Sequence, residues 1–168
     1  LWPGAPRATE APLARTVLAL YDGTLEREPR MTRIHRMVEM PLNHLGIVVR
    51  YLDVNARLPP VETLHDVRGV ITWFRYTKLK DPDGYLTWVE SSLRAGKRFV
   101  VLGDFGATNA DTGLAVSLSQ MNRIWALLGL RDIGRSVALT YDVRPVFTDS
   151  CLFGFERPLP PVLPAYES

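Results

Sequence analysis

Short apolar runs along the chain are separated by longer segments in which apolar residues recur at helical spacing. The runs predict β-strands, and their nearly continuous apolar character is typical of strands covered on both faces. They are residues 16–21, 47–52, 69–74, 98–102 and a shorter run at 136–141. Because strands that alternate with helices form right-handed βαβ units, the pattern predicts an open three-layer α/β sandwich with a mostly parallel sheet of about five strands.

The intervening periodic segments predict three helices, at residues 32–45, 81–95 and 114–128. Asp81 is placed to cap the second helix and Pro82 suits its first turn. Gly46, Gly96 and Gly129 follow the segments and are expected to end the helices. Pro41 lies inside the first segment, where it removes a hydrogen bond and should kink or shorten the helix.

Proline concentrates near both ends of the chain. It occurs three times within residues 1–15, and residues 158–164 read Pro-Leu-Pro-Pro-Val-Leu-Pro, which favours an extended path. We therefore expect a linker over 1–15, an α/β domain over 16–155, and a linker or packed arm over 156–168. This arrangement is typical of one module of a longer protein.

Composition narrows the possible functions. The 168 residues carry a formal net charge of +2, too close to neutral to indicate nucleic-acid binding. No apolar run reaches the roughly 18 residues of a membrane span. The single cysteine, Cys151, excludes an internal disulfide and a multi-cysteine metal site, and its apolar neighbours indicate a buried filler.

The carboxyl ends of the predicted strands are where a ligand site is expected in an open parallel sheet. Candidate ligand-binding residues at these ends are Asp22, Gly23, Asp53, Arg75, Tyr76, Asp104 and Phe105. Each also has a structural explanation, because Asp and Gly commonly form the turns that follow strands. We predict no metal site, cofactor or catalytic residue among them.

Two of these strand ends are similar to catalytic motifs but lack the nucleophile. Asp22-Gly23-Thr24-Leu25 is similar to the box of haloacid-dehalogenase-type phosphatases, yet Leu20 occupies the position of the attacking carboxylate. Gly103-Asp104-Phe105-Gly106 lies where class I glutamine-amidotransferase-like folds place a nucleophile elbow, without Cys or Ser at its apex. A phosphate loop for FMN would need more hydroxyl residues than Thr24, and no Rossmann GxGxxG is present.

Charged side chains gather in and before the first predicted helix. His35, Glu39 and Asn43 share its polar face, where a local His–Glu contact is expected rather than half of a metal site. A cationic cluster comprises Arg27, Arg30, Arg33 and Arg36. We expect these arginines to pair with Glu26, Glu28 or Glu39, and the alternative is a patch that recognises an anionic partner.

The block Arg33-Ile-His-Arg-Met-Val-Glu-Met-Pro-Leu-Asn-His-Leu-Gly46, together with the later Val100-Val-Leu-Gly-Asp-Phe-Gly106, resembles the middle α/β domain of Pel-type exopolysaccharide proteins. The resemblance covers about residues 16–155. It implies a flavodoxin-like or amidotransferase-like fold, placed between a glycoside-hydrolase-like barrel and a polysaccharide deacetylase barrel on one periplasmic chain. The catalytic motifs of those barrels are missing here, so the resemblance transfers no catalytic residue.

We therefore expect a non-catalytic α/β domain of a larger extracytoplasmic protein that processes a biofilm exopolysaccharide. Its expected partners are the flanking domains of the same chain, and polysaccharide or another exopolysaccharide-system protein. One alternative is a metal-dependent hydrolase or phosphatase that uses Asp22 and Asp104. Another is a small-ligand or sugar-binding module that uses Tyr21, Arg75, Tyr76 and Phe105.

Overall fold

The computed structural model describes residues 13–76, 78–138 and 162–167. The chain forms two compact units, Leu1–Val116 and Ser117–Ser168. The predicted limit of the α/β domain at residue 155 lies outside the described residues, as does Cys151. In the described part of the chain, no helix combines the length and the apolar character that crossing a membrane requires.

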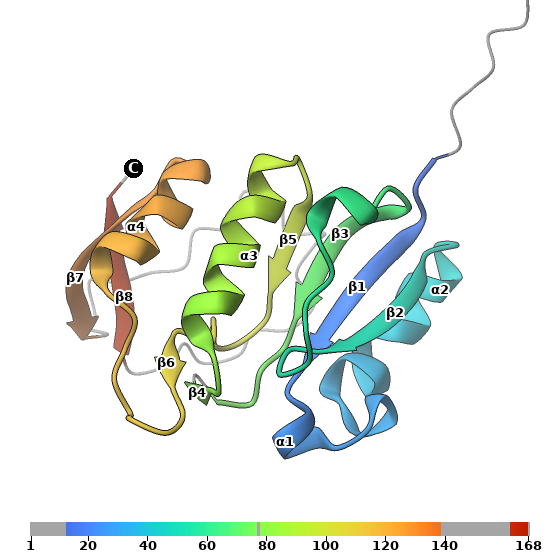
Figure 1. Ribbon diagram of the computed structural model, residues 1–168, viewed down its shortest axis with the longest axis horizontal. Helices are drawn as coiled ribbons and strands as arrows, with labels where there is room; N and C mark the ends of the chain where they lie inside the picture. The colour runs from blue at the N-terminus through green and yellow to red at the C-terminus, as the bar shows by residue number, and fades with distance from the viewer. Residues whose placement is uncertain (1–12, 77, 139–161, 168) are drawn as a thin grey trace, which may run out of the picture. The chain divides into compact units, whose positions relative to one another are not determined.

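The first unit is built on a parallel sheet of four strands (Figure 1). These strands are β1 (Thr16–Tyr21), β2 (Val48–Asp53), β3 (Val67–Thr72) and β5 (Arg98–Val101), and their order is β2-β1-β3-β5. All three neighbouring pairs are parallel. Counted along the chain the order is 2-1-3-4, which matches the start of the flavodoxin-like order and places the topological switch point between β1 and β3.

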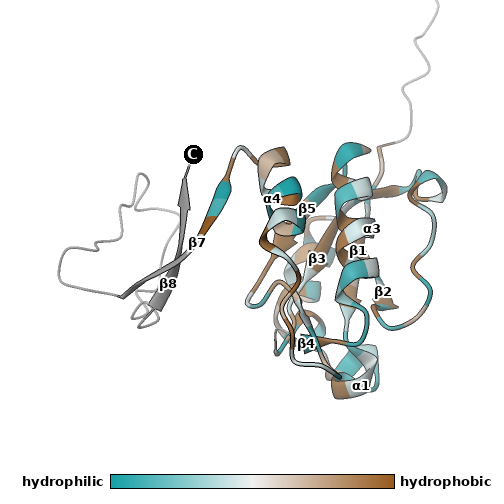
Figure 2. Ribbon diagram, turned by 60° about the vertical axis from the view of Figure 1, so that its left-hand side comes forward, coloured by the Kyte–Doolittle hydropathy of each residue, from teal (hydrophilic) through white to brown (hydrophobic). Residues whose placement is uncertain are grey.

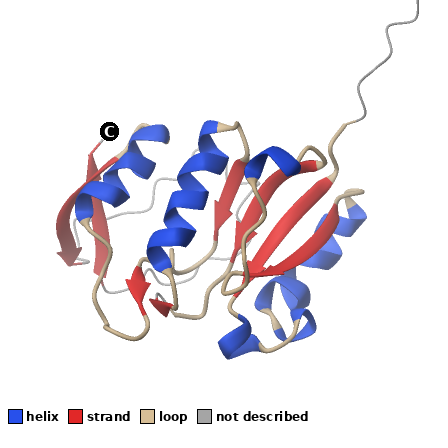
Figure 3. Cartoon of the chain, viewed as in Figure 1, coloured by secondary structure: helices blue, strands red, loops and turns tan. Residues whose placement is uncertain are grey.

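Helices cover both faces of this sheet, so the predicted open α/β sandwich is confirmed (Figure 3). Successive residues of a strand point to opposite faces. On one face, α3 (Pro82–Arg94) packs Trp88 against Phe99 of β5, with ring centroids 6.2 Å apart. On the other face, Ile34 packs with Ala19 of β1 and Ile71 of β3. The ribbon of β1 and β3 is correspondingly apolar (Figure 2).

The helix that covers the second face contains a π-helical segment, η2 (His35–Glu39), which is followed by α2 (Met40–His44). Pro41 occupies the first turn of α2. Proline has no N–H to donate, and its ring clashes with the carbonyl of the fourth residue before it. The wider π turn directly before Pro41 is thus the local distortion that the sequence predicted as a kink.

The other helices confirm most of the predicted boundaries. Asp81 caps α3 by accepting a hydrogen bond from the backbone N–H of Gly84 at 2.9 Å. The predicted third helix is shorter than expected, because α4 (Leu118–Leu127) begins only after Ser117. Before Ser117, Ala115 forms an isolated antiparallel bridge with Thr108, and Val116 N–H donates to the carbonyl of Ala107 at 2.8 Å. Their backbone groups are therefore engaged by the preceding loop and are unavailable to a helix.

Short elements complete the first unit. The predicted loop at 22–30 contains a single helical turn, α1 (Gly23–Glu26), and is followed by the 3-10 turn η1 (Pro29–Met31). A second 3-10 turn, η3 (Val61–Thr63), lies between β2 and β3. Two-residue strands β4 (Lys78–Leu79) and β6 (Thr108–Asn109) pair in parallel.

The fifth predicted strand does not join the parallel sheet, so the expectation of about five strands is corrected to four among the described residues. Its described part belongs to β7 (Arg131–Ala138) in the second unit. β7 pairs antiparallel with β8 (Val162–Glu167), which lies within the proline-rich segment 156–168. The apolar pattern indicated a strand, but a pattern does not specify which strand will supply the backbone hydrogen bonds.

Candidate functional site

Asp22 follows β1 and is 5% exposed, and one oxygen of its carboxylate, Oδ1, is engaged by internal hydrogen bonds. Its Oδ1 accepts from the backbone N–H of Thr24 at 3.0 Å, from the Thr24 hydroxyl at 2.6 Å and from the Asn55 amide at 2.7 Å. Asp22 is also the residue that caps α1. The candidate carboxylate therefore fixes the turn after β1 and ties it to the loop after β2.

Asp53 has the same kind of role at the end of β2. Its Oδ1 accepts from the backbone N–H groups of Gly23 at 3.0 Å and Asn55 at 2.9 Å. A Cβ atom added at Gly23 would lie 2.2 Å from Asp53 Oδ2. The structure thus brings the predicted residues Asp22, Gly23 and Asp53 together, as a network that joins two loops. Leu20, in place of the phosphatase nucleophile, is fully buried in the core.

The turn after β5, residues 103–106, leads to the short strand β6 and not to a helix. Gly103 and Gly106 both have φ of +78°, a conformation that residues with a Cβ rarely adopt. A Cβ at Gly106 would lie 2.6 Å from Leu79 Cδ1. The glycine thus permits a close approach of the segment that follows β3, and not of a helix.

The two side chains at the centre of this turn, Asp104 and Phe105, have different surroundings. Phe105 is half-buried and packs on Tyr85 of α3, with ring centroids 6.3 Å apart. Asp104 is exposed, and its backbone bridges to Phe74. Within the described residues no ion pair joins Asp104 to Arg75. The Arg75 guanidinium lies over the Tyr76 ring instead, 5.9 Å from its centroid.

Asp22 and Asp104 belong to strand ends that are not neighbours. β3 lies between β1 and β5 in the sheet, and two strand spacings amount to about 10 Å. In the parts of the chain that the structure describes, no group of three or more metal-ligating side chains is found. The two carboxylates are therefore poorly placed to share one Mg²⁺ ion.

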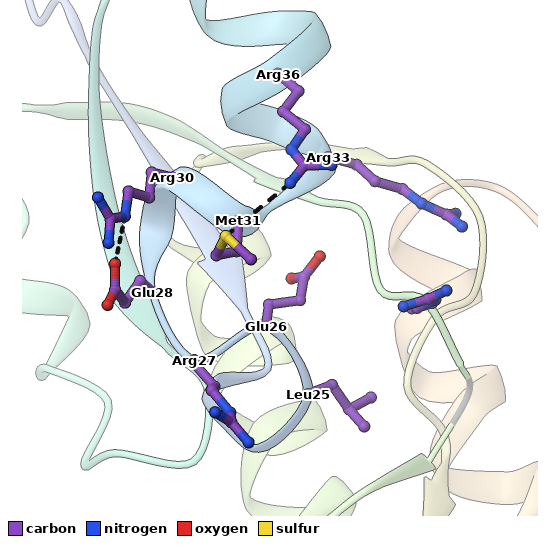
Figure 4. A pocket seen from close by; sticks show the side chains of 9 residues that line it. Leu25, Glu26, Arg27, Glu28, Arg30, Met31, Arg33 and Arg36 are labelled. Carbon is purple, nitrogen blue, oxygen red and sulfur yellow. Dashed lines mark hydrogen bonds and ion pairs between the residues drawn. The ribbon is translucent and has the colours of Figure 1, made fainter.

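A cleft with a volume of about 560 Å³ lies at the carboxyl end of the sheet, and we call it the arginine cleft (Figure 4). It is lined by the segment after β1, by the start of the following helix and by Arg75, which follows β3. The lining residues are Leu25, Glu26, Arg27, Glu28, Arg30, Met31, Arg33, Arg36 and Arg75. Because its walls come from the ends of β1 and β3, the cleft lies at the topological switch point.

Only one arginine of the cluster has the carboxylate partner that we expected. Arg30 forms an ion pair with Glu28. Arg33 instead lies over the Trp73 ring, 5.9 Å from its centroid, and Arg36 contacts the Met31 sulfur at 4.0 Å. In the described part of the chain, no ion pair joins Arg27, Arg33, Arg36 or Arg75 to a carboxylate.

Glu39, the third expected partner, is used elsewhere. It contacts His35 one helical turn away and accepts a hydrogen bond from the Tyr51 hydroxyl of β2 at 2.7 Å. Burial by itself would raise the pKa of Glu39, but the hydrogen bonds from Tyr51 and His35 outweigh burial and lower this pKa. The predicted local His–Glu contact is confirmed. The hydrogen bond from Tyr51 to Glu39 links this helix to the sheet.

Glu26 is the acidic residue at the middle of the arginine cleft (Figure 4). Burial raises the pKa of this carboxyl above its ordinary value. The backbone N–H and the charge of Arg33 oppose that effect, as does the charge of Arg75, whereas the charge of Asp22 adds to it. The resident carboxylate is thus partly desolvated among guanidinium groups.

Arg27, which directly follows the last residue of α1, has a strained backbone. Its φ is +50° with ψ of −45°, and it is the one residue other than glycine with positive φ among those described. The backbone N–H of Glu28 donates to the carbonyl of Glu26, which makes Arg27 the centre of a γ-turn of the rare positive-φ kind. Strain of this kind concentrates at functional sites.

The sequence indicates the arginine cluster at 27–36 and Arg75 separately, and does not indicate that they line one cleft. The available signal was an arginine at every third position before and within one helix, together with an arginine at a strand end. Comparison of the chain with family models, curated proteins and solved structures found no match.

Proposed function

We propose that this chain is a non-catalytic α/β domain of a larger extracytoplasmic exopolysaccharide-processing protein. In that protein it scaffolds the neighbouring catalytic domains, or binds polymer or a partner protein. The family context rests on the resemblance of residues 33–46 and 100–106 to Pel-type proteins, which also supports a periplasmic location.

The observation that carries the non-catalytic part is the use of the strand-end carboxylates. Asp22 and Asp53 hold backbone N–H groups and the Asn55 amide, so both serve the turns that they belong to. A general base or a metal ligand needs an oxygen directed at substrate or ion. The cleft beside them supplies guanidinium groups, which bind and orient a ligand but do not attack it.

The competing proposal, a metal-dependent hydrolase or phosphatase, requires Asp22 and Asp104 to act on the same ion. The strand order places β3 between the two strand ends, and no specific contact favours that function.

Turnover measurements on the whole chain test the non-catalytic proposal. Acetylated amino-sugar oligomers, aryl esters and aryl phosphates are incubated with the protein, with and without Mg²⁺ and Zn²⁺. We expect no hydrolysis above a boiled control. D104N should leave the free energy of unfolding within about 0.5 kcal/mol of the parent chain, because Asp104 is exposed. Metal-dependent turnover that disappears in D104N would overturn the proposal.

A titration with oligomers of acetylated and deacetylated amino sugars, followed by amide NMR shifts, tests the polymer-binding part. Shifts that saturate and cluster on the first unit support this part. Unchanged spectra at millimolar oligomer would restrict the proposal to scaffolding.

A further inference from the structure

We propose that the arginine cleft binds a small oxyanion, namely a carboxylate or phosphoryl group carried by a soluble molecule. This inference rests on the geometry of the cleft and does not depend on the exopolysaccharide context.

The charge of the lining selects for an anion. Five of the nine lining residues are arginines and only two are carboxylates. One of these carboxylates, Glu28, is already paired with Arg30. Four guanidinium groups therefore share one remaining carboxylate, and planar guanidinium groups match carboxylate and phosphoryl oxygens in pairs of parallel hydrogen bonds.

The size and position of the cleft favour a small ligand over a macromolecule. Its volume of about 560 Å³ falls in the range of small-molecule pockets. It is concave, and it lies at the switch point between β1 and β3. At such a point the connections that leave the two strands run in opposite directions, which leaves a crevice for a ligand. A flat basic surface would suit a polyanionic polymer better than this cleft does.

Two of the arginines are oriented before any ligand arrives. The Arg33 guanidinium lies over Trp73 and that of Arg75 lies over Tyr76, and both aromatic residues follow β3. Cation–π contacts restrict these long side chains without using their N–H donors. Less rotamer entropy is then lost when the donors bind an oxyanion.

Glu26 identifies the place that the oxyanion would take. Its side chain points into the cleft, among Arg27, Arg33 and Arg36 (Figure 4). A ligand carboxylate or phosphate would compete with this resident carboxylate for the same cations. Removing the charge of Glu26 should therefore strengthen anion binding, whereas removing an arginine charge should weaken it.

Calorimetric titration of the whole chain tests the proposal, with inorganic phosphate, D-glucuronate and neutral D-glucose as probes. We expect millimolar or tighter binding of at least one anionic probe, no binding of glucose, and an affinity that falls with added NaCl. The anion that binds more tightly distinguishes a phosphoryl ligand from a carboxylate ligand.

Four variants make the test specific to the cleft. R36Q and R75Q should each lower the affinity about tenfold or more, since charge-assisted hydrogen bonds are lost. E26Q should raise the affinity severalfold. R68Q is the matched control, because Arg68 is exposed on β3 outside the cleft and carries the same charge. Thermal melts confirm that each variant is folded.

Absence of binding for both anions would overturn the proposal, as would equal losses in R36Q, R75Q and R68Q or weaker binding in E26Q. None of these results bears on the non-catalytic proposal, which turnover measurements test separately. Conversely, hydrolytic activity would overturn the non-catalytic function and leave the anion site standing.

Discussion

The strained backbone at Arg27 predicts that glycine at this position stabilises the fold. A non-glycine residue in such a sparsely populated region costs about 1–3 kcal/mol. Against this, glycine loses about 0.4–1 kcal/mol more than alanine through the entropy of the unfolded chain. Because the strain at φ +50° depends on the Cβ atom, R27A retains it and R27G relieves it.

R27G should therefore be more stable than R27A by up to about 2.5 kcal/mol, the difference between the two opposing effects. For a chain of this length each kcal/mol corresponds to about 2–4 °C in Tm. Urea denaturation followed by tryptophan fluorescence measures the difference, and an unchanged slope shows that the variants unfold to the same extent.

The alanine variant is the matched control, since both substitutions remove the guanidinium group. Both should lose phosphate or glucuronate affinity to the same extent, so only the stability separates them. At an unstrained loop position glycine is the less stable of the two. If R27G is less stable than R27A, the positive-φ turn does not store strain and the reasoning fails.

Three further outcomes follow from the contacts described. L86A should destabilise the chain by about 2–5 kcal/mol in urea denaturation, because Leu86 of α3 is fully buried, whereas a cost below about 1 kcal/mol would contradict that packing. D81A should cost about 1 kcal/mol through the loss of the cap on Gly84, measured against D81N, which keeps an oxygen that can accept from this N–H, and an equal effect in both variants would count against capping. Burial raises the pKa of Glu26 in the folded state, so its contribution to stability is greatest below the unfolded-state pKa and is lost as pH rises through the folded-state pKa. E26Q should accordingly be more stable than the parent chain at neutral pH and lose this advantage in mild acid, and a pH-independent difference would refute the assignment.

Local sequence determined the elements of the first unit. The run Thr16–Tyr21 was predicted as a strand with both limits correct, because nearly continuous apolar residues satisfy a strand buried on both faces. Asp81 and Pro82 fixed the start of α3 through capping, which involves only residues of the same turn. The alternation of strands and helices then sufficed for an open α/β sandwich.

The start of α4 and the partner of the last predicted strand could not be obtained in this way. Backbone groups near Val116 bond to Ala107, and β7 pairs with β8 across a long stretch of sequence. Which of several possible partners a strand or a backbone group takes depends on free energies of non-local contacts. A periodic pattern contains no information about them.

The same distinction between local sequence and non-local contacts applies to the candidate site. The sequence by itself indicated that Asp22, Asp53 and Arg75 follow strands, and that arginines recur from Arg27 onward. Only the tertiary structure decided that Asn55, 33 positions from Asp22, occupies the Asp22 carboxylate. Only the strand order β2-β1-β3-β5 placed Arg75 beside the residues that follow β1. The type of a residue determines which groups its side chain can bind. The fold determines which groups of the chain lie close enough to bind it.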